Sequence, residues 1–349
     1  MLRIDQGAKV LGAIVLAASV LAAMPAAQAA VDGPKVNWTL ASFGKARPGS
    51  ACMDSLAEMV AAETKGNFTI KIAYGETLSP AKEILDGIKI GAFELGFWST
   101  PYAPGKQPTA TVFTLPFLPL GDGASATRIG DIYYQHPAVK RDFDAWDSVY
   151  LMPVLVPAYE FIGSGAPPTR ITDWRGKRVR ALGGQGDAMG KLGAATANVP
   201  SPEVYGALEK GLIDAAALPY YAFTSFKLYE VSKWYTKGLD LGSILTNVPI
   251  NKAAYEKLPP QYKKLLVDVK PKALEAQVKA LEADDDQTIA LLKSRGLKEV
   301  VVESSVREEI VKLAAQPIWD EWVKDMTAKG YPGRELLDVI LNEAKKARS

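Results

Sequence analysis

The chain contains one cysteine and one histidine, Cys52 and His136, among its 349 residues. A single cysteine excludes any intramolecular disulfide. Zinc sites built from several cysteine or histidine ligands are excluded as well. A Ser-His-Asp or Cys-His catalytic site would have to use His136, and no G-x-S-x-G motif accompanies it. We therefore expect no metal site and no cofactor, and we interpret Cys52 as a small apolar residue on a buried helix face.

Neither sign of charge predominates, since 41 Lys and Arg residues face 39 Asp and Glu residues. No stretch concentrates enough basic residues to form a nucleic-acid groove. Three consecutive acidic residues occur at 284–286. Consecutive side chains of a helix point in different directions, so this run predicts a solvated patch rather than a metal site. A secreted enzyme would have to use carboxylate or tyrosine groups, which spacing alone does not identify.

Long apolar runs are missing except at the amino terminus. Arg3 and Lys9 precede an uncharged apolar run at 10–24, and small residues follow at 26–30. This order is typical of a secretory signal peptide, with cleavage predicted after Ala29. The alternative, a retained membrane helix, needs roughly 20 apolar residues, more than this run supplies. We expect a periplasmic protein whose mature chain of about 320 residues is long enough for two domains.

Strand and helix patterns alternate through the first two thirds of the chain. The first unit has predicted strands at 37–43, 68–74 and 93–98 and predicted helices at 50–64 and 80–90. A second unit has predicted strands at 150–156, 178–182 and 212–217 and predicted helices at 187–197 and 202–210. Such an order implies parallel strands joined by crossover helices. The sequence thus predicts an α/β protein with two units, and the cleft between them is the default ligand site.

The last third is predicted to be helical. Apolar residues recur at helical spacing over 262–292, and Pro271 interrupts this run. Ser305 and Glu308 form a capping-box pattern at the start of the next predicted helix. A final helix is predicted at about 333–346.

Four stretches, in order along the chain, resemble motifs of the solute-binding proteins of TRAP transporters, the DctP type. They are TLPFL at 114–118, ITDWRGKRVR at 171–180, PEVYGALEKGLID at 202–214 and KLYEVSK at 227–233. One such match is weak, whereas four ordered matches are specific. The resemblance covers the whole predicted mature chain.

The resemblance implies a type II-like periplasmic binding protein whose two α/β lobes are linked by crossover segments and followed by long C-terminal helices. Lobe I would comprise 31–157 plus 244–283, and lobe II 158–243 plus 284–349. Such lobes close around a ligand like a hinged clamp. The loaded protein would deliver a small organic acid to a permease with a small and a large membrane subunit. The alternatives are an ABC-type or sensory binding protein for a small polar or amine ligand, and a secreted enzyme.

Arg180 is the first candidate for ligand binding. In the resembling family, the arginine that ends the second motif forms a paired contact with a substrate carboxylate. A planar guanidinium presents two parallel donors that match two carboxylate oxygens. The alternative is a surface residue beside Arg178, because the two share one strand face.

Other positions differ from the family pattern. Glu160 stands where relatives that bind simple acids often carry a second arginine, and Leu218 replaces an asparagine. Glu160 would bond a ligand hydroxyl or amine, or pair with Arg180. Apolar and aromatic side chains thus replace polar anchors, which favours a monocarboxylate with an apolar or aromatic body. The predicted ligand-binding residues besides Arg180 are Phe43, Trp98, Ser99, Tyr102, Tyr159, Glu160, Phe161, Leu218, Tyr220 and Tyr221.

Overall fold

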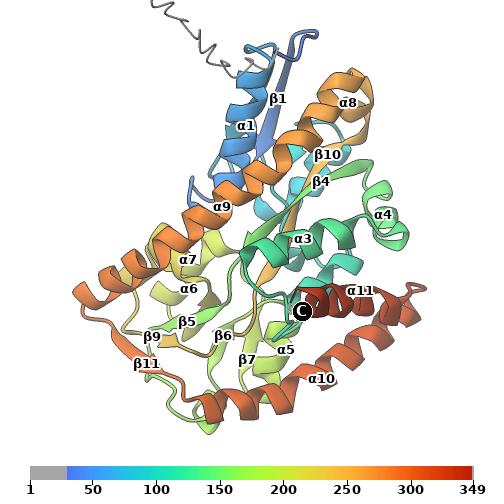
Figure 1. Cartoon of the computed structure of the whole chain (residues 1–349). Helices are drawn as coiled ribbons and strands as arrows, with labels where there is room; N and C mark the ends of the chain where they lie inside the picture. Colours follow the sequence, from blue (N-terminus) through green and yellow to red (C-terminus); the bar gives the residue numbers. More distant parts are fainter. Residues whose placement is uncertain (1–29, 348–349) are drawn as a thin grey trace, which may run out of the picture. The chain divides into compact units, whose positions relative to one another are not determined.

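The computed structural model describes residues 30–347, so the predicted signal peptide lies outside the described residues. Within this range the strands form two sheets, one of five strands and one of six (Figure 1). None of the helices in the described part of the chain is both long enough and apolar enough to cross a bilayer. The α/β fold class with two units is therefore confirmed.

The first sheet has the strand order β2-β1-β3-β10-β4. Its strands are β1 (Val36–Ala41), β2 (Phe68–Ala73), β3 (Leu95–Gly96), β4 (Ser148–Val156) and β10 (Ile244–Asn251). β1 pairs in parallel with both β2 and β3, as the β-α-β pattern predicted, and α1 (Ala51–Glu63) and α2 (Ile84–Lys89) lie in the crossovers.

The strand predicted at 93–98 is shorter in the structure. β3 pairs with β10 at Leu95, and a separate bridge joins Trp98 to Asn247. Between these contacts lies Pro249 of β10, which has no N–H to donate to the ladder. The ladder is therefore interrupted at this point.

The second sheet has the order β11-β9-β5-β8-β6-β7. Its strands are β5 (Glu160–Gly163), β6 (Arg178–Arg180), β7 (Ala195–Ala197), β8 (Ala215–Leu218), β9 (Trp234–Lys237) and β11 (Lys298–Val301). The helix predicted at 187–197 is α5 (Gly183–Lys191), which ends earlier than expected. Gly193 follows it with φ +83°, the left-handed conformation that terminates helices, and β7 begins two residues later.

The chain passes between the two sheets three times within the described residues: at 157–159, at 238–243 and along α9 (Pro260–Ser294). The first two connections bond to each other, since the Tyr159 amide donates to the Gly242 carbonyl and the Leu241 amide to the Tyr159 carbonyl. α9 contacts α1 beside the first sheet and α7 (Tyr220–Ser225) beside the second (Figure 1). The predicted lobe boundaries stay a prediction.

The C-terminal helices differ from the sequence prediction in two details. α9 continues through Pro271, because the carbonyl deprived of its bond belongs to Val267, a residue that is 55% exposed and open to water. α10 (Ser304–Ala328) has Glu303 as its N-cap and no side-chain cap bond, so the predicted capping box is wrong. α11 (Gly333–Lys346) lies where it was predicted.

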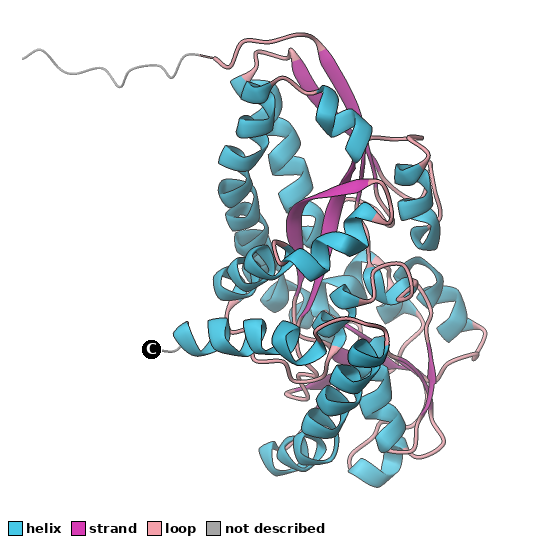
Figure 2. Ribbon diagram, turned by 90° about the vertical axis from the view of Figure 1, so that its right-hand side faces the viewer, coloured by secondary structure: helices cyan, strands magenta, loops and turns pink. Residues whose placement is uncertain are grey.

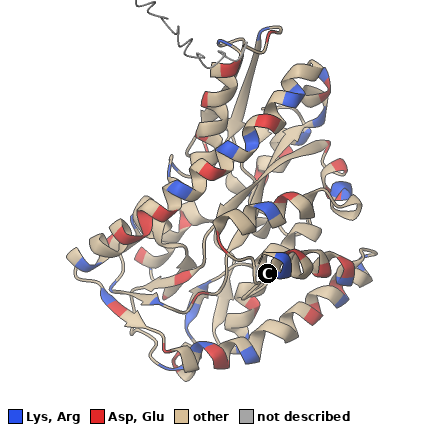
Figure 3. Cartoon of the chain, viewed as in Figure 1, with Lys and Arg blue, Asp and Glu red and all other residues tan. Residues whose placement is uncertain are grey.

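Helices flank the strands of both sheets (Figure 2). The remaining helices are α3 (Gly123–Tyr134), α4 (Pro137–Asp144), α6 (Val204–Glu209) and α8 (Lys252–Lys257). One core cluster joins the first sheet to α1, α2 and α9, and others pack around the second sheet and α10. Basic and acidic residues are interspersed along α9 and α10 (Figure 3), and 284–286 lie on α9 as a charged stretch.

Cys52 lies in α1 and is completely buried. Burial raises the pKa of its thiol to about 12. The nucleophilic form of cysteine is the thiolate, so we expect no reaction of the folded protein with a disulfide reagent at mildly alkaline pH. Following the coloured product with and without concentrated guanidinium chloride checks this. Labelling of one thiol should require unfolding, and rapid labelling of the native protein would contradict it.

Candidate ligand-binding site

Arg180 ends β6 and is completely buried, unlike Arg178 two residues earlier. Its Nε donates to the Val199 carbonyl at 2.9 Å, and its Nη1 donates to the Ala217 carbonyl at 2.5 Å. Its Nη2 donates to Ser201 Oγ at 3.4 Å. The acceptors come from the segments around β7 and β8, the two strands that flank β6. The sheet thus fixes this guanidinium in one orientation.

The partners of Arg180 are all neutral. Among residues 30–347, no carboxylate forms an ion pair with it. Tyr159 interacts electrostatically with the guanidinium, and burial raises the pKa of this tyrosine, so its hydroxyl stays protonated. A buried cation without a counterion is costly, and a bound anion would relieve that cost. The site is therefore electrostatically suited to a carboxylate.

Tyr102 and Ser201 join Arg180 to aromatic side chains. The Tyr102 hydroxyl donates to Ser201 Oγ at 2.9 Å and accepts from the Ser201 amide at 3.1 Å. The Phe43 ring meets the Tyr102 ring edge to face, with 5.4 Å between centroids. Tyr221 is buried and interacts electrostatically with Tyr102. The structure therefore brings five predicted site residues together: Phe43, Tyr102, Tyr159, Arg180 and Tyr221.

This cluster lies where segments from the two sheets meet. Tyr102 ends the 3₁₀ turn at Thr100–Tyr102, which follows β3 of the first sheet. Ser201 follows β7 of the second sheet. A further bond crosses at the same place, from Asn198 Nδ2 to the Pro101 carbonyl at 2.7 Å. A ligand held here would contact residues of both units.

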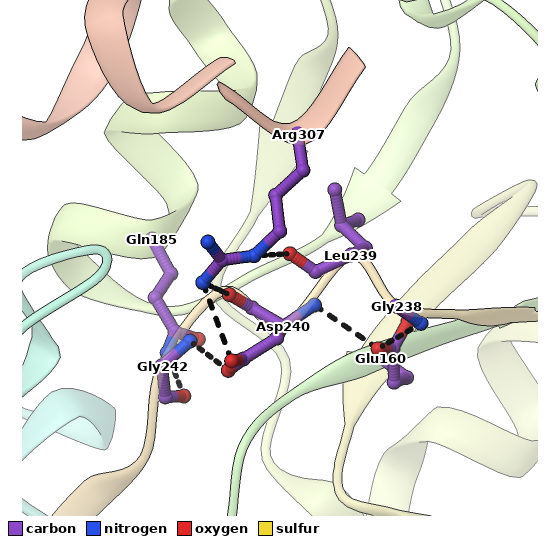
Figure 4. Close-up of polar contacts among 7 residues, drawn as sticks. All are labelled: Glu160, Gln185, Gly238, Leu239, Asp240, Gly242 and Arg307. Carbon is purple, nitrogen blue, oxygen red and sulfur yellow. Dashed lines mark hydrogen bonds and ion pairs between the residues drawn. The ribbon is translucent and has the colours of Figure 1, made fainter. Parts of the chain in front are cut away.

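Glu160 has a different set of partners (Figure 4). Its carboxylate accepts hydrogen bonds from Thr236 Oγ1 at 2.5 Å, from the Gly238 amide at 2.9 Å and from the Asp240 amide at 3.0 Å. Burial is the main cause that raises the pKa of this carboxyl group. No bond to Arg180 is found among the described contacts. Glu160 holds the connection between β9 and β10 instead.

Two further side chains fasten the same connection (Figure 4). Arg307 of α10 donates to the Leu239 and Asp240 carbonyls and forms an ion pair of 3.3 Å with the Asp240 carboxylate. Gln185 of α5 donates to the Gly242 carbonyl at 2.8 Å. The connection from the second sheet to the first is thus bonded at its start by Glu160 and along its length by helices.

Three other predicted site residues lie beside Glu160 or in the core. Leu218 stands opposite Glu160 in the β5–β8 pair. The Tyr220 hydroxyl donates to the Thr236 carbonyl at 3.0 Å. Phe161 packs on Trp174, with 4.5 Å between ring centroids. None of the three has a described polar contact with Arg180.

Trp98 and Ser99 lie just before the turn that carries Tyr102. Trp98 is fully buried, its backbone bonds Asn247, and its indole Nε1 has no hydrogen-bond partner. The Ser99 carbonyl accepts the Tyr102 amide at 3.0 Å. Ser99 therefore supports the position of Tyr102, and Trp98 joins the start of this segment to β10.

Arg47 and Ser201 belong to the surroundings of the site but were not predicted from the sequence. Arg47 lies in the loop after β1, is 8% exposed and interacts with the Tyr221 hydroxyl. The sequence signal was slight, a basic residue before Pro48-Gly49 at the end of a strand. Ser201 carried no signal beyond its place before the third family motif.

Known proteins similar to this chain cover most of its length. The 2,3-diketo-L-gulonate-binding periplasmic protein of Escherichia coli is 28% identical over 292 residues, covering 81% of this chain and 84% of the relative. A monocarboxylate 2-oxoacid-binding periplasmic protein of Nostoc is 24% identical over 309 residues, with 85% and 82% covered.

Solved structures show the same fold. A TRAP solute-binding protein of Rhodoferax ferrireducens, in complex with copurified benzoate, superposes with a TM-score of 0.82 at 23% identity and covers 89% of this chain and 98% of its own. A marine metagenome TRAP solute-binding protein specific for aromatic acid ligands, with 3-hydroxybenzoate, gives 0.81 at 23% identity, covering 90% and 99%.

The family assignment rests on a match to a family model that spans most of the chain. The sequence pattern of the DctP family, described as bacterial extracellular solute-binding protein, family 7, matches residues 46–325. That range contains the four motifs and every residue of the Arg180 cluster except Phe43. The family consists of binding proteins rather than enzymes. The resemblance seen in the sequence is thereby confirmed, and the chain belongs to bacterial extracellular solute-binding protein family 7.

Proposed function

We propose that this protein is the periplasmic receptor of a TRAP transporter and captures a small organic acid through Arg180. The observation that carries the proposal is a buried guanidinium without a carboxylate partner among the described residues. The relatives and structural neighbours whose ligands are named bind acids such as benzoate, 3-hydroxybenzoate and 2-oxoacids. The captured acid would pass, unchanged, to the small and large membrane subunits of the permease.

The side chains around Arg180 support an acid with an apolar or aromatic body. A carboxylate on the guanidinium would also lie beside the protonated hydroxyl of Tyr159, which is able to donate to it. The rings of Phe43, Tyr102 and Tyr221 would then cover the rest of the ligand. Because these residues come from segments of both sheets, an acid bound here would favour the closed arrangement of the two units.

The bonds between Tyr102 and Ser201 and between Asn198 and Pro101 would stabilise that closed arrangement. Both must break for the segments to separate. Closure removes the ligand from water, which strengthens its bond to the buried guanidinium. The proposed binding residues are thus Arg180, Tyr159, Tyr102, Tyr221 and Phe43.

Thermal unfolding of the exported chain with a panel of small molecules tests the proposal. The panel contains benzoate, mandelate and pyruvate, together with benzylamine and benzamide, which match the ring of the two aromatic acids but lack the carboxylate. A ligand at hundredfold excess over its dissociation constant stabilises the fold by about 2.7 kcal/mol. We expect at least one acid, and neither control, to raise the melting temperature, with the acid recovered unchanged. A rise with only the amine or the amide would contradict the proposal, and conversion of the acid would point to an enzyme.

A further inference from the structure

Arg47 is a second buried guanidinium near the Arg180 cluster. It lies in the loop between β1 and the 3₁₀ turn Pro48–Ser50 and is 8% exposed. Its Nη1 donates to the carbonyls of Phe43 and Lys45, both at 2.8 Å. Its Nε is buried and has no hydrogen-bond partner. Among the ion pairs of residues 30–347, none involves Arg47.

Three phenylalanine rings fix the plane of this guanidinium. Its central carbon lies 5.1 Å from the ring centroid of Phe43, 5.5 Å from that of Phe97 and 5.6 Å from that of Phe226. Such contacts stabilise a cation through its faces and supply no hydrogen-bond acceptor. The two carbonyls bond Nη1, and the Tyr221 hydroxyl interacts with the guanidinium, yet Nε itself has no partner. The edge of the guanidinium that carries Nε is therefore held in place without an acceptor.

The position of Arg47 relates it to the proposed ligand. Tyr221 interacts with both Arg47 and Tyr102, and Phe43 touches both Arg47 and Tyr102. Tyr159 and Ser201 connect Tyr102 in turn to Arg180. Arg47 thus stands at one end of the aromatic cluster, and Arg180 stands at the other. An acid that is held by Arg180 and covered by these shared rings would have Arg47 among the neighbours of its body.

We infer that the ligand carries a second oxygen atom, as hydroxyl, carbonyl or carboxylate, at the end remote from the carboxylate bound by Arg180. This inference rests on the proposed function. A buried donor without an acceptor is costly, and so is a buried cation without a counterion. An oxygen of the ligand that accepts from Arg47 Nε relieves both costs. A purely hydrocarbon body leaves Nε without a partner and forgoes that gain.

The predicted monocarboxylate with an apolar body is thereby refined to an acid that is oxygenated at its far end. A role of Arg47 in the loop alone is the competing explanation, since its Nη1 bonds hold 43–45 in place. The two explanations differ in one measurable respect. A loop anchor affects all ligands equally, whereas an acceptor-binding arginine affects only those that carry the second oxygen.

Calorimetric titration of the full exported chain with two matched series makes this comparison. One series is benzoate, 3-hydroxybenzoate and benzene-1,3-dicarboxylate, and the other is hexanoate and adipate. A hydrogen bond to a charged group contributes about 1.5–3 kcal/mol, so the oxygenated members should bind roughly 10- to 150-fold more tightly than their parents. In Arg47→Met this preference should disappear, while the parent acid keeps its affinity within about threefold. The hydroxyl and carboxylate members show whether a neutral or an anionic oxygen is preferred.

Two further variants keep the test decisive. Arg47→Lys retains a cation near the two carbonyls but has a carbon at the Nε position, so it should also lose the preference. It replaces Arg47→Met as the test variant if Arg47→Met does not fold. Arg334→Met changes an exposed arginine of α11 in the same way and should alter nothing. Equal affinities within each series for the unaltered protein, or a preference that survives in both Arg47 variants, would overturn the inference alone. Failure of every acid to bind would overturn the proposed function as well.

Discussion

Replacing Arg180 by methionine is expected to weaken the binding of organic acids by at least about thirtyfold. Removing one partner of a buried, hydrogen-bonded charge pair costs about 2–5 kcal/mol, which corresponds to roughly 30- to 5,000-fold in affinity. The loss should be near the upper end, because the guanidinium is completely buried and no second cation of the described residues bonds Ser201 or Tyr159. Calorimetry with an acid identified by thermal unfolding measures it.

Arg180→Lys should give a smaller but clear loss. Lysine keeps the charge, yet it cannot present two parallel donors to a carboxylate while also bonding the Val199 and Ala217 carbonyls. Either substitution leaves carbonyls short of a donor, so the melting temperature of the ligand-free protein should fall moderately. Circular dichroism of both variants shows whether the fold is kept.

Arg178→Met is the matched control on the same strand. Arg178 is exposed and forms its ion pair with Asp214. Exposed pairs of this kind contribute little, so affinity should stay unchanged. Equal weakening by Arg178→Met and Arg180→Met would show that the strand, rather than the guanidinium, matters. Unchanged affinity in Arg180→Met would remove Arg180 from the site.

The elements that were predictable from the sequence have strong local patterns. The strand at Phe68–Ala73 alternates apolar and polar residues, and α11 has apolar residues at helical spacing with its start at Gly333. β7 was missed because its three residues, Ala-Thr-Ala, are too few and too exposed to produce a pattern. The short β3 depends on Pro249, a residue more than a hundred positions away in β10.

The central residue of the site was predictable because a family motif marked it. Arg180 stands at the end of a family motif, and the structure places it in the cluster with four other predicted residues. Arg47 was missed because its partners Phe97, Phe226 and Tyr221 come from three distant parts of the chain. Nothing in the local sequence says that such a loop arginine is buried. Glu160 was predicted to contact the ligand or to pair with Arg180. Its hydrogen-bond partners at 236–240 are also distant in the sequence, so the local pattern did not reveal them.

Replacing Glu160 by alanine should destabilise the protein by about 1–3 kcal/mol. The substitution leaves the amides of Gly238 and Asp240 and the hydroxyl of Thr236 without their acceptor. The Thr236 hydroxyl is buried, and leaving it unpaired costs about 1–3 kcal/mol, whereas water is able to bond the amides of exposed Gly238 and half-buried Asp240. Relief of the buried carboxyl group offsets part of this cost, because burial disfavours its charged form. Denaturant unfolding followed by tryptophan fluorescence measures the difference.

Glu160→Gln separates the charge of this side chain from its hydrogen bonds. The carbonyl oxygen of the glutamine side chain is able to accept from the two amides. We therefore expect Glu160→Gln to lose less stability than Glu160→Ala. The pKa of Glu160 is raised above the usual 4.5. In the unfolded chain Glu160 loses its proton near the usual pKa of 4.5, whereas in the folded protein it holds the proton to a higher pH. The unfolding free energy contributed by Glu160 therefore falls across this window, and Glu160→Gln does not show that fall.

Unfolding of the unaltered protein and of Glu160→Gln from acidic to neutral pH reveals this difference. The stability of Glu160→Gln relative to the unaltered protein should increase as the pH rises and then level off above the folded pKa. Glu308→Gln makes the same chemical change at an exposed position of α10 and should show no such trend. The stability of Glu160→Gln relative to the unaltered protein could instead stay constant or decrease as the pH rises. That result would mean that ionisation of Glu160 does not destabilise the folded protein. Glu160 would then hold the β9–β10 connection as an anion, with its three donors outweighing its burial.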